Sequence, residues 1–148
     1  MEICSIGSSG ISAEEFFETL RNVGATSIVD TRLHASSQLA GFTKKSTLGY
    51  LAPELLHIPY FHEMLLAPEA ADLRGYRHSR MSWDEYAKRY KQLLKKRDPL
   101  STLDITRWGT KPVLLCSEPQ AEKCHRRLAA EYLQEVASGV RAITHLEP

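Results

Sequence analysis

Apolar positions along the chain fall into two patterns, short continuous runs and repeats at helical spacing. The short runs are rich in isoleucine, valine and leucine and predict five strands. They cover Ile3–Ile6, Thr26–Asp30, Leu56–Phe61, Pro112–Cys116 and Val140–Leu146. The fourth run is apolar at every position, a pattern typical of a strand that is buried on both faces of a sheet.

The segments between these runs have the end signals and the spacing of helices. Ser12 and Ser82 are each followed three residues later by a glutamate, the capping-box pattern that predicts a helix start. Apolar spacing predicts two further helices over about Lys44–Ala52 and Ala121–Val136, and Pro68 is placed to begin another. Strands that alternate with helices predict an α/β fold, with three layers in which helices cover both faces of a mostly parallel sheet of about five strands.

Length and composition agree with one globular domain over residues 1–148. A chain of 148 residues can bury a hydrophobic core without staples, and 43% hydrophobic with 25% charged residues is ordinary for a globular protein. The net charge of +1 gives no electrostatic argument for nucleic-acid or membrane partners. We interpret the basic segment Lys88–Arg97 as a solvated helix face, and Trp83, Tyr86 and Tyr90 as core residues of the same helix.

The cysteines indicate a reducing compartment. There are three, Cys4, Cys116 and Cys124, an odd number at a density too low for a disulfide scaffold. The first residues carry an acid where a secretory signal would carry positive charge, and no apolar run approaches the length that spans a bilayer. We therefore expect a cytoplasmic protein with no membrane partner.

Polar side chains gather where three of the predicted strands end. These residues are Ser8 and Ser9, Asp30 and Arg32, and Cys116, Ser117 and Glu118. Ligands of open parallel sheets bind outside the carboxyl ends of the strands, so we expect the three groups to share one cleft. Arg126, near the start of the next predicted helix, is placed to lean over that cleft.

The residue types in this cleft fit a small anionic ligand. Arg32 and Arg126 are candidate bidentate partners for a phosphate or a carboxylate. Ser8 and Ser9 lead into a predicted helix, so their backbone N–H groups are further candidates for binding an anion.

The same cleft holds candidates for catalysis. Cys116 or Cys124, near a helix start with His125 adjacent, is a candidate nucleophile or redox group with a lowered pKa. Glu118 or Asp30 is the candidate proton-transfer group. The alternative for each cysteine is a small buried core residue, and the alternative for the aspartate is a structural ion pair with the neighbouring arginine.

Several of these segments resemble the domain of unknown function 488 family of small bacterial and archaeal proteins. The matching segments are Ser5–Ser9, Val29–Arg32, Leu65–Pro68, Ser82–Tyr86 with Arg89 and Tyr90, and Leu114–Glu118 followed by Cys124–Arg126. The last of these, with its Cys-x-Glu and Cys-His-Arg pieces, is the most specific. The resemblance implies an α/β fold with these polar residues as the site, and it implies no particular reaction. Many similar sequences have histidine in the first motif, as Gly-His-Ser, where this chain has Ser8.

Three hypotheses about function follow. The first is a small enzyme that binds a nucleotide or a phosphorylated metabolite at the carboxyl ends of the strands and uses the cysteine, glutamate, histidine and arginine side chains. The second is a non-catalytic accessory module that recognises a nucleotide or a nucleic acid in the same cleft. The third is a metal-binding protein that holds zinc or iron through Cys116, Cys124 and His125. The first two imply no cofactor.

Overall fold

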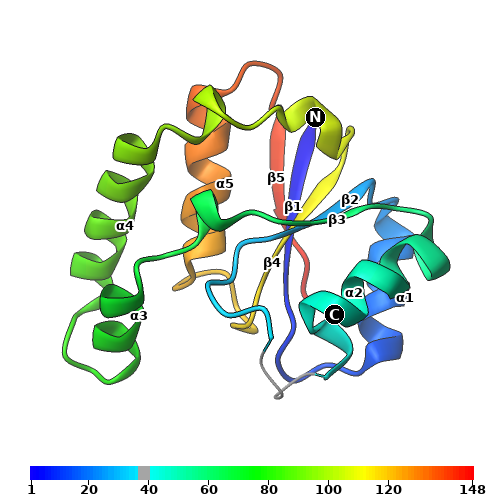
Figure 1. Ribbon diagram of the computed structural model, residues 1–148, viewed down its shortest axis with the longest axis horizontal. Coiled ribbons are helices and arrows are strands. Elements are labelled where there is room, and N and C mark those ends of the chain that lie inside the picture. The colour runs from blue at the N-terminus through cyan, green and yellow to red at the C-terminus, as the bar shows by residue number, and fades with distance from the viewer. Residues whose placement is uncertain (37–40) are drawn as a thin grey trace.

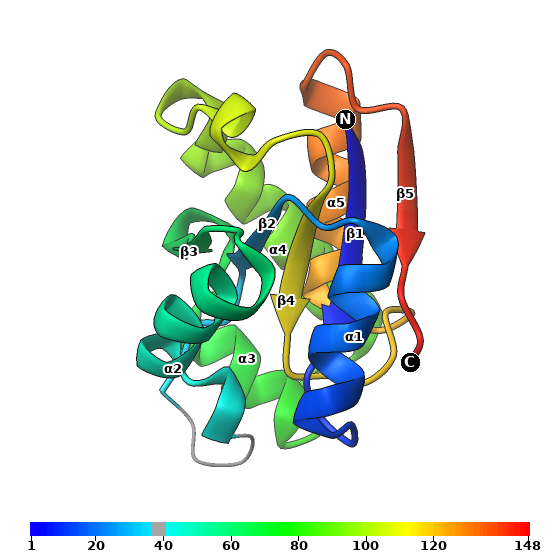
Figure 2. The same ribbon diagram turned by 90° about the vertical axis from the view of Figure 1, so that its right-hand side faces the viewer.

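The computed structural model describes residues 1–36 and 41–148 and contains a sheet of five parallel strands. The strands are β1 (Glu2–Gly7), β2 (Ser27–Asp30), β3 (Tyr60–His62), β4 (Pro112–Cys116) and β5 (Ala142–His145). Their order is β3-β2-β4-β1-β5, so β4 lies in the centre of the sheet between β2 and β1 (Figure 2). The predicted parallel sheet is confirmed.

Helices cover both faces of this sheet, which confirms the predicted three-layer α/β fold (Figure 1). The helices are α1 (Ala13–Val23), α2 (Lys45–Leu51), α3 (Ala70–Arg77), α4 (Trp83–Arg97) and α5 (His125–Val136). Helices α1 and α2 lie on one side of the strands, and α4 and α5 lie on the other. A π-helical turn, Ala52–Leu56, extends α2, and short 3-10 turns occupy Gly41–Thr43, Met64–Leu66, Pro99–Ser101 and Ile105–Trp108. Among the described residues, no helix is both long and apolar enough to cross a membrane.

The third predicted strand, Leu56–Phe61, begins later than predicted. The chain remains helical through Leu56, and the strand starts at Tyr60, at the edge of the sheet. Pro59 explains the late start, since it has no N–H group to donate to a neighbouring strand. Its carbonyl still accepts a hydrogen bond from the N–H of Ile28 on β2.

The helix predicted over Ala121–Val136 also begins later, at His125, and this change shapes the site. Residues 117–124 form a loop that connects β4 to α5. Cys124 occupies the N-cap position with extended backbone, φ −134° and ψ 141°. The loop therefore carries Glu118 and ends at the second cysteine of the motif.

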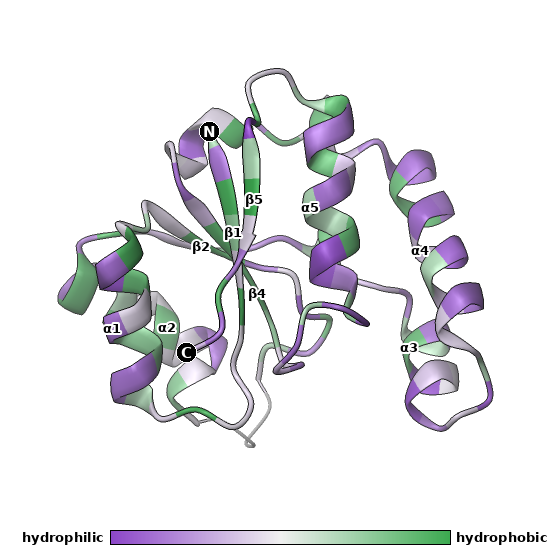
Figure 3. Ribbon diagram, turned by 180° about the vertical axis from the view of Figure 1, so that it is seen from behind, coloured by the Kyte–Doolittle hydropathy of each residue, from purple (hydrophilic) through white to green (hydrophobic). Residues whose placement is uncertain are grey.

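The apolar residues of the central strand divide between two core layers, because side chains alternate along a strand. Val113 and Leu115 belong to the layer beneath α1, whereas Leu114 packs with Leu128 and Leu133 of α5. All five residues of β4 are buried, as the apolar pattern predicted. Figure 3 shows that polar colouring predominates on α4, at the outer edge of the molecule beyond α5.

Candidate active site

Cys116 ends the central strand on the face of the sheet that α5 covers. It follows Leu114 by two residues, so the two side chains point to the same face. The Cys116 side chain is buried, with 1% exposed. Its thiol therefore lies at the carboxyl edge of the sheet, beneath the start of α5.

Arg126 is the main charged partner of this thiol. It lies in the first turn of α5, and its side chain is fully buried. Its Nη1 donates to Cys116 Sγ over 3.0 Å and to the carbonyl oxygen of Glu118 over 2.5 Å. Its Nε donates to Ser5 Oγ over 3.1 Å. A guanidinium held this close to a buried sulfur favours the thiolate over the thiol.

Cys124 is the second partner of the Cys116 thiol. Burial alone raises the pKa of Cys116, but a hydrogen bond from Cys124 and the charge and N–H group of Arg126 outweigh it, so the net pKa is lowered. Burial and the hydrogen bond to Cys116 raise the pKa of Cys124 well above its ordinary value. Neither cysteine is in a disulfide. Of the two, Cys116 has the lower pKa and is the one that more readily forms a thiolate.

Ser5 is a further hydrogen-bond partner of Arg126. Its hydroxyl is fully buried within β1 and lies 2.6 Å from Nδ1 of His145 on β5. Burial, with the charges of Arg126 and Arg127, lowers the pKa of His145 and favours its neutral ring. The Ser5 hydroxyl thus accepts from Arg126 and shares a hydrogen bond with His145. This contact gives His145 a structural role at the edge of the sheet.

Gly7, the last residue of β1, allows the loop after β4 to lie against the sheet. A Cβ atom at this position would stand 1.8 Å from the carbonyl oxygen of Glu118. That same carbonyl accepts a hydrogen bond from Arg126. Close approach of the two backbones therefore requires glycine here.

Ser8 and Ser9 extend the contact between β1 and this loop. Ser8 N–H donates to the carbonyl of Cys116 over 3.0 Å, and Ser9 N–H donates to the carbonyl of Ser117 over 3.1 Å. The expectation that these two N–H groups bind an anion is wrong, because both are already donated to the loop. Ser9 lines the cavity described below, whereas Ser8 is buried outside it.

His125 is the first residue of α5, and its ring is nearly buried, with 8% exposed. Its Nε2 lies 2.9 Å from the carbonyl oxygen of Thr31 and 3.0 Å from the Thr31 hydroxyl, which itself donates to the carbonyl of Leu115. Nε2 therefore carries the ring proton and donates to Thr31. Burial lowers the pKa of His125 to about 4, so the ring is neutral at pH 7 and its Nδ1 remains as an acceptor.

Asp30 and Arg32 form a buried ion pair on the opposite face of the sheet from Cys116. Asp30 is the register partner of Leu115, so its side chain points toward α1 and α2. Arg32 donates to the carboxylate through Nη2 over 2.7 Å and Nε over 2.9 Å, and the Tyr60 hydroxyl donates over 2.5 Å. The prediction that Asp30 shares one cleft with Cys116 is therefore wrong, and the geometry is that of the alternative ion pair.

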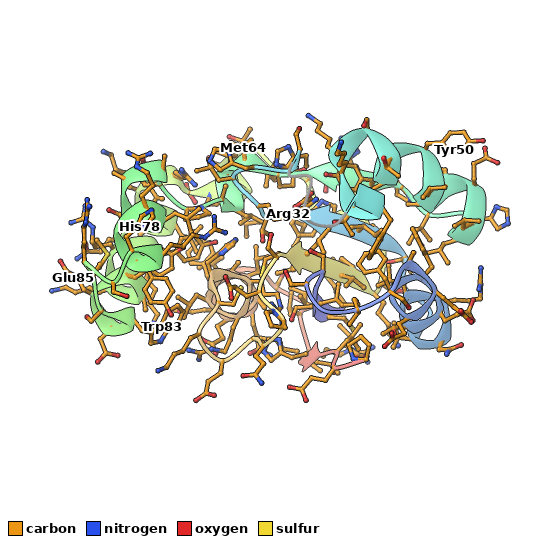
Figure 4. The ribbon with its side chains drawn as sticks, turned by 90° about the horizontal axis from the view of Figure 1, so that it is seen from below. Arg32, Tyr50, Met64, His78, Trp83 and Glu85 are labelled. Carbon is orange, nitrogen blue, oxygen red and sulfur yellow. The ribbon has the colours of Figure 1, made fainter. Side chains whose placement is uncertain are left out.

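A cavity of about 520 Å³ opens at the carboxyl ends of the strands, a volume in the range that holds small organic ligands. The polar part of its lining includes Cys116, Ser117, Cys124 and His125. The apolar part includes Leu33, Pro68, Leu73 and Tyr76. Figure 4 looks onto this edge of the molecule, with Arg32 near the centre and α3 and α4 to one side.

Charged side chains stand around the cavity. The cations are Arg32, Arg77 and Lys123, and the anion is Glu118. Arg32 is nearly buried by its pairing with the aspartate, whereas the other three side chains are exposed at the mouth. Arg126 is not part of the lining, because its guanidinium makes its hydrogen bonds to Ser5, Cys116 and the Glu118 carbonyl beneath the cavity.

The sequence did not identify the residues that α3 and α4 contribute. Tyr76 and Arg77 belong to α3, and Tyr86 belongs to the first turns of α4. The rings of Tyr76 and Tyr86 stack with centroids 4.8 Å apart. Helical spacing marked Tyr86 as a core residue, which its 2% exposure supports, but nothing in that spacing shows that a cavity adjoins it.

The geometry does not support the metal alternative. Within residues 1–36 and 41–148, no three histidine, cysteine, aspartate or glutamate side chains are grouped so that they could hold a metal ion. Cys116 and Cys124 are adjacent, but His125 directs its Nε2 at Thr31.

The description "Domain of unknown function DUF488" belongs to a family whose profile matches residues 12–133. The chain belongs to this family. The DUF488 match includes the loop after β4 and most of α5, and it leaves out the segment with Ser8. No curated protein and no solved structure matches the chain. The family description names no reaction for this DUF488 protein.

Proposed function

We propose that this DUF488 protein is a cysteine-dependent enzyme in which the Cys116 thiolate attacks a small phosphorylated substrate. One observation carries the proposal: Nη1 of Arg126 lies 3.0 Å from Cys116 Sγ at the floor of a cavity. A cysteine that only fills a core has no need of a buried guanidinium, whereas a nucleophilic cysteine needs its thiolate form.

Three features support an anionic substrate. Arg77 and Lys123 place positive charge at the mouth of the cavity. Among the described residues, no side chain caps the start of α5, and Cys124 and His125 at this positive end of the helix dipole line the cavity. The neutral ring of His125 can accept a hydrogen bond from a protonated phosphate oxygen through Nδ1.

The reaction has two steps in this proposal. In the first, the electron pair of Cys116 Sγ forms a bond to phosphorus while the bond from phosphorus to the ester oxygen breaks, and the departing alcohol takes a proton from solvent. In the second, water attacks phosphorus, the bond to sulfur breaks, and the thiolate and inorganic phosphate are released. Glu118, exposed at the mouth, accepts the proton of that water.

This proposal changes the roles predicted for two residues. Arg126 stabilises the thiolate instead of binding the substrate, because its donors are used beneath the cavity. Asp30 maintains the fold instead of transferring a proton, because Arg32 and Tyr60 occupy its carboxylate. A cytoplasmic location belongs to the same proposal, since a reducing compartment keeps a thiolate pair active.

The test is hydrolysis of an aryl phosphate that releases a coloured product, p-nitrophenyl phosphate. The wild type is expected to release p-nitrophenolate, and Cys116→Ser is expected to lose turnover by at least about a hundredfold. Cys4→Ala is the matched control, because Cys4 is equally buried but lies in the core layer beneath α1. Acid-quenched wild-type protein should carry one added phosphoryl group on the peptide that contains Cys116.

Two results would count against the proposal. Equal turnover by the wild type and Cys116→Ser would remove the thiolate from the reaction. Binding of the aryl phosphate without turnover would favour the second hypothesis, a non-catalytic module that recognises a nucleotide in this cavity.

A further inference from the structure

The hydroxyl of Tyr86 is buried beside the cavity and has no hydrogen-bond partner among the described residues. Tyr86 as a whole is 2% exposed, so water outside the protein does not satisfy this hydroxyl. Buried tyrosine hydroxyls ordinarily have a partner, because leaving one unpaired destabilises the folded protein. The neighbouring Tyr90 follows the ordinary rule, since its hydroxyl donates to the carbonyl of Leu66 over 2.6 Å.

The unpaired tyrosine borders the same cavity as the reacting groups. Tyr86, Cys116, Cys124 and Arg77 all line that cavity. Burial raises the pKa of Tyr86, so the hydroxyl stays protonated at neutral pH and is a donor. This hydroxyl is therefore a donor with no acceptor in the fold, on a residue that borders the cavity with the two cysteines.

We infer that Tyr86 is a substrate-binding residue whose hydroxyl donates to a phosphate oxygen, and that the substrate is a phosphate monoester of an apolar, ring-sized group. The inference rests on the proposed function for the position of the phosphate beside Cys116. It adds a binding residue from α4 and a class of alcohol to that proposal.

The shape of the cavity carries the second half of the inference. Inorganic phosphate fills a small part of a cavity of about 520 Å³. The remainder faces the side chains of Leu33, Pro68, Leu73 and Tyr76, which offer apolar contact to a ligand. A phosphate bound to the polar lining residues, with an aromatic or branched apolar alcohol in contact with the apolar ones, would use both kinds of lining residue.

Binding of phenyl phosphate to the Cys116→Ser protein tests the inference without any turnover. Calorimetry is expected to show tighter binding of phenyl phosphate than of inorganic phosphate. Adding Tyr86→Phe, which keeps the ring and its stacking on Tyr76, is expected to weaken phenyl phosphate binding by about tenfold or more. Thermal unfolding without ligand should show that Tyr86→Phe is at least as stable as its parent, because the change removes an unpaired buried hydroxyl.

Tyr90→Phe is the matched control, since it removes a hydroxyl that is paired within the fold. It should lower the unfolding temperature and leave phenyl phosphate binding unchanged. Equal binding to the parent and Tyr86→Phe would overturn the role of Tyr86, and absence of phenyl phosphate binding would overturn the substrate class. Tyr86-dependent binding in a protein whose wild type shows no turnover would uphold this inference and remove the proposed catalysis.

Discussion

The guanidinium of Arg126 and the thiol of Cys116 meet across a strand-to-helix connection, with Nη1 3.0 Å from Sγ. The loop of residues 117–124 separates the two along the chain, yet Arg126 also donates to the carbonyl of Glu118 within that loop. One buried side chain thus fixes the loop and favours the thiolate. Stability and reactivity are therefore coupled at this point.

Replacement of Gly7 by alanine should displace the loop that carries Glu118. The added methyl group would overlap the Glu118 carbonyl, which stands 1.8 Å from the ideal Cβ position. We expect Gly7→Ala to lower the free energy of unfolding by about 3 kcal/mol or more, as overpacked backbone contacts do, and to reduce turnover of p-nitrophenyl phosphate. Urea unfolding provides the measurement.

Gly49→Ala is the matched control for this steric argument. Gly49 is exposed within α2, and a Cβ atom there would have nothing within 4 Å. Alanine in a helix is favoured over glycine, so this variant should gain about 1 kcal/mol in the free energy of unfolding. Equal stability of Gly7→Ala and the wild type would contradict the close approach of Gly7 and Glu118.

Asp30→Asn tests the structural role of the buried ion pair. The change leaves the Arg32 guanidinium without its charged partner on the α2 side of the sheet. We expect a loss of about 3 kcal/mol in the free energy of unfolding, typical of a buried pair that loses one member. The pH dependence of turnover by the folded fraction should stay unchanged, and a shifted profile would return Asp30 to the list of proton-transfer candidates.

His125 should make the fold less stable at acid pH. Its pKa is lowered to about 4 in the folded protein from 6.5, so between these values the unfolded chain binds the proton more readily. The contribution of the neutral ring to the free energy of unfolding is fully present above pH 6.5 and is lost as the pH falls toward 4. The interval corresponds to a change of about 3 kcal/mol in the free energy of unfolding.

His125→Gln is the variant that isolates this effect, because its amide can donate to the Thr31 carbonyl and does not titrate in this range. Urea unfolding at pH 7.0, 5.5 and 4.5 should show a smaller loss of stability for the variant than for the wild type, about half or less. Parallel losses in the two proteins would show that another group causes the acid sensitivity.

Much of the fold follows from local patterns in the sequence. The apolar run Pro112–Cys116 is a strand buried on both faces, and the Ser12 capping box starts α1 as predicted, with hydrogen bonds in both directions. The late start of α5 could not be predicted from the spacing of apolar residues. Residues 121–124 continue the apolar and polar pattern of the helix, although their backbone forms a turn that precedes it.

The site was predicted in part, and register explains where the prediction failed. Strand ends do gather at one edge, but alternate residues of a strand point to opposite faces. Asp30 pairs in register with Leu115 and not with Cys116, so it faces α1 and α2. The contribution of Tyr86 depends on how α3 and α4 pack together, a relation between distant segments that no single motif encodes.

The rate of Cys116 alkylation as a function of pH tests the central claim most directly. Mass spectrometry after brief treatment with iodoacetamide would follow Cys116 separately from Cys4 and Cys124, in the wild type, in Arg126→Lys and in the milder Ser5→Ala. We predict that wild-type Cys116 reacts as a thiolate well below an ordinary cysteine pKa of about 8.5, and that both variants shift the profile to higher pH. A wild-type profile at or above the ordinary value, or the same profile in all three proteins, would contradict the thiolate at Cys116.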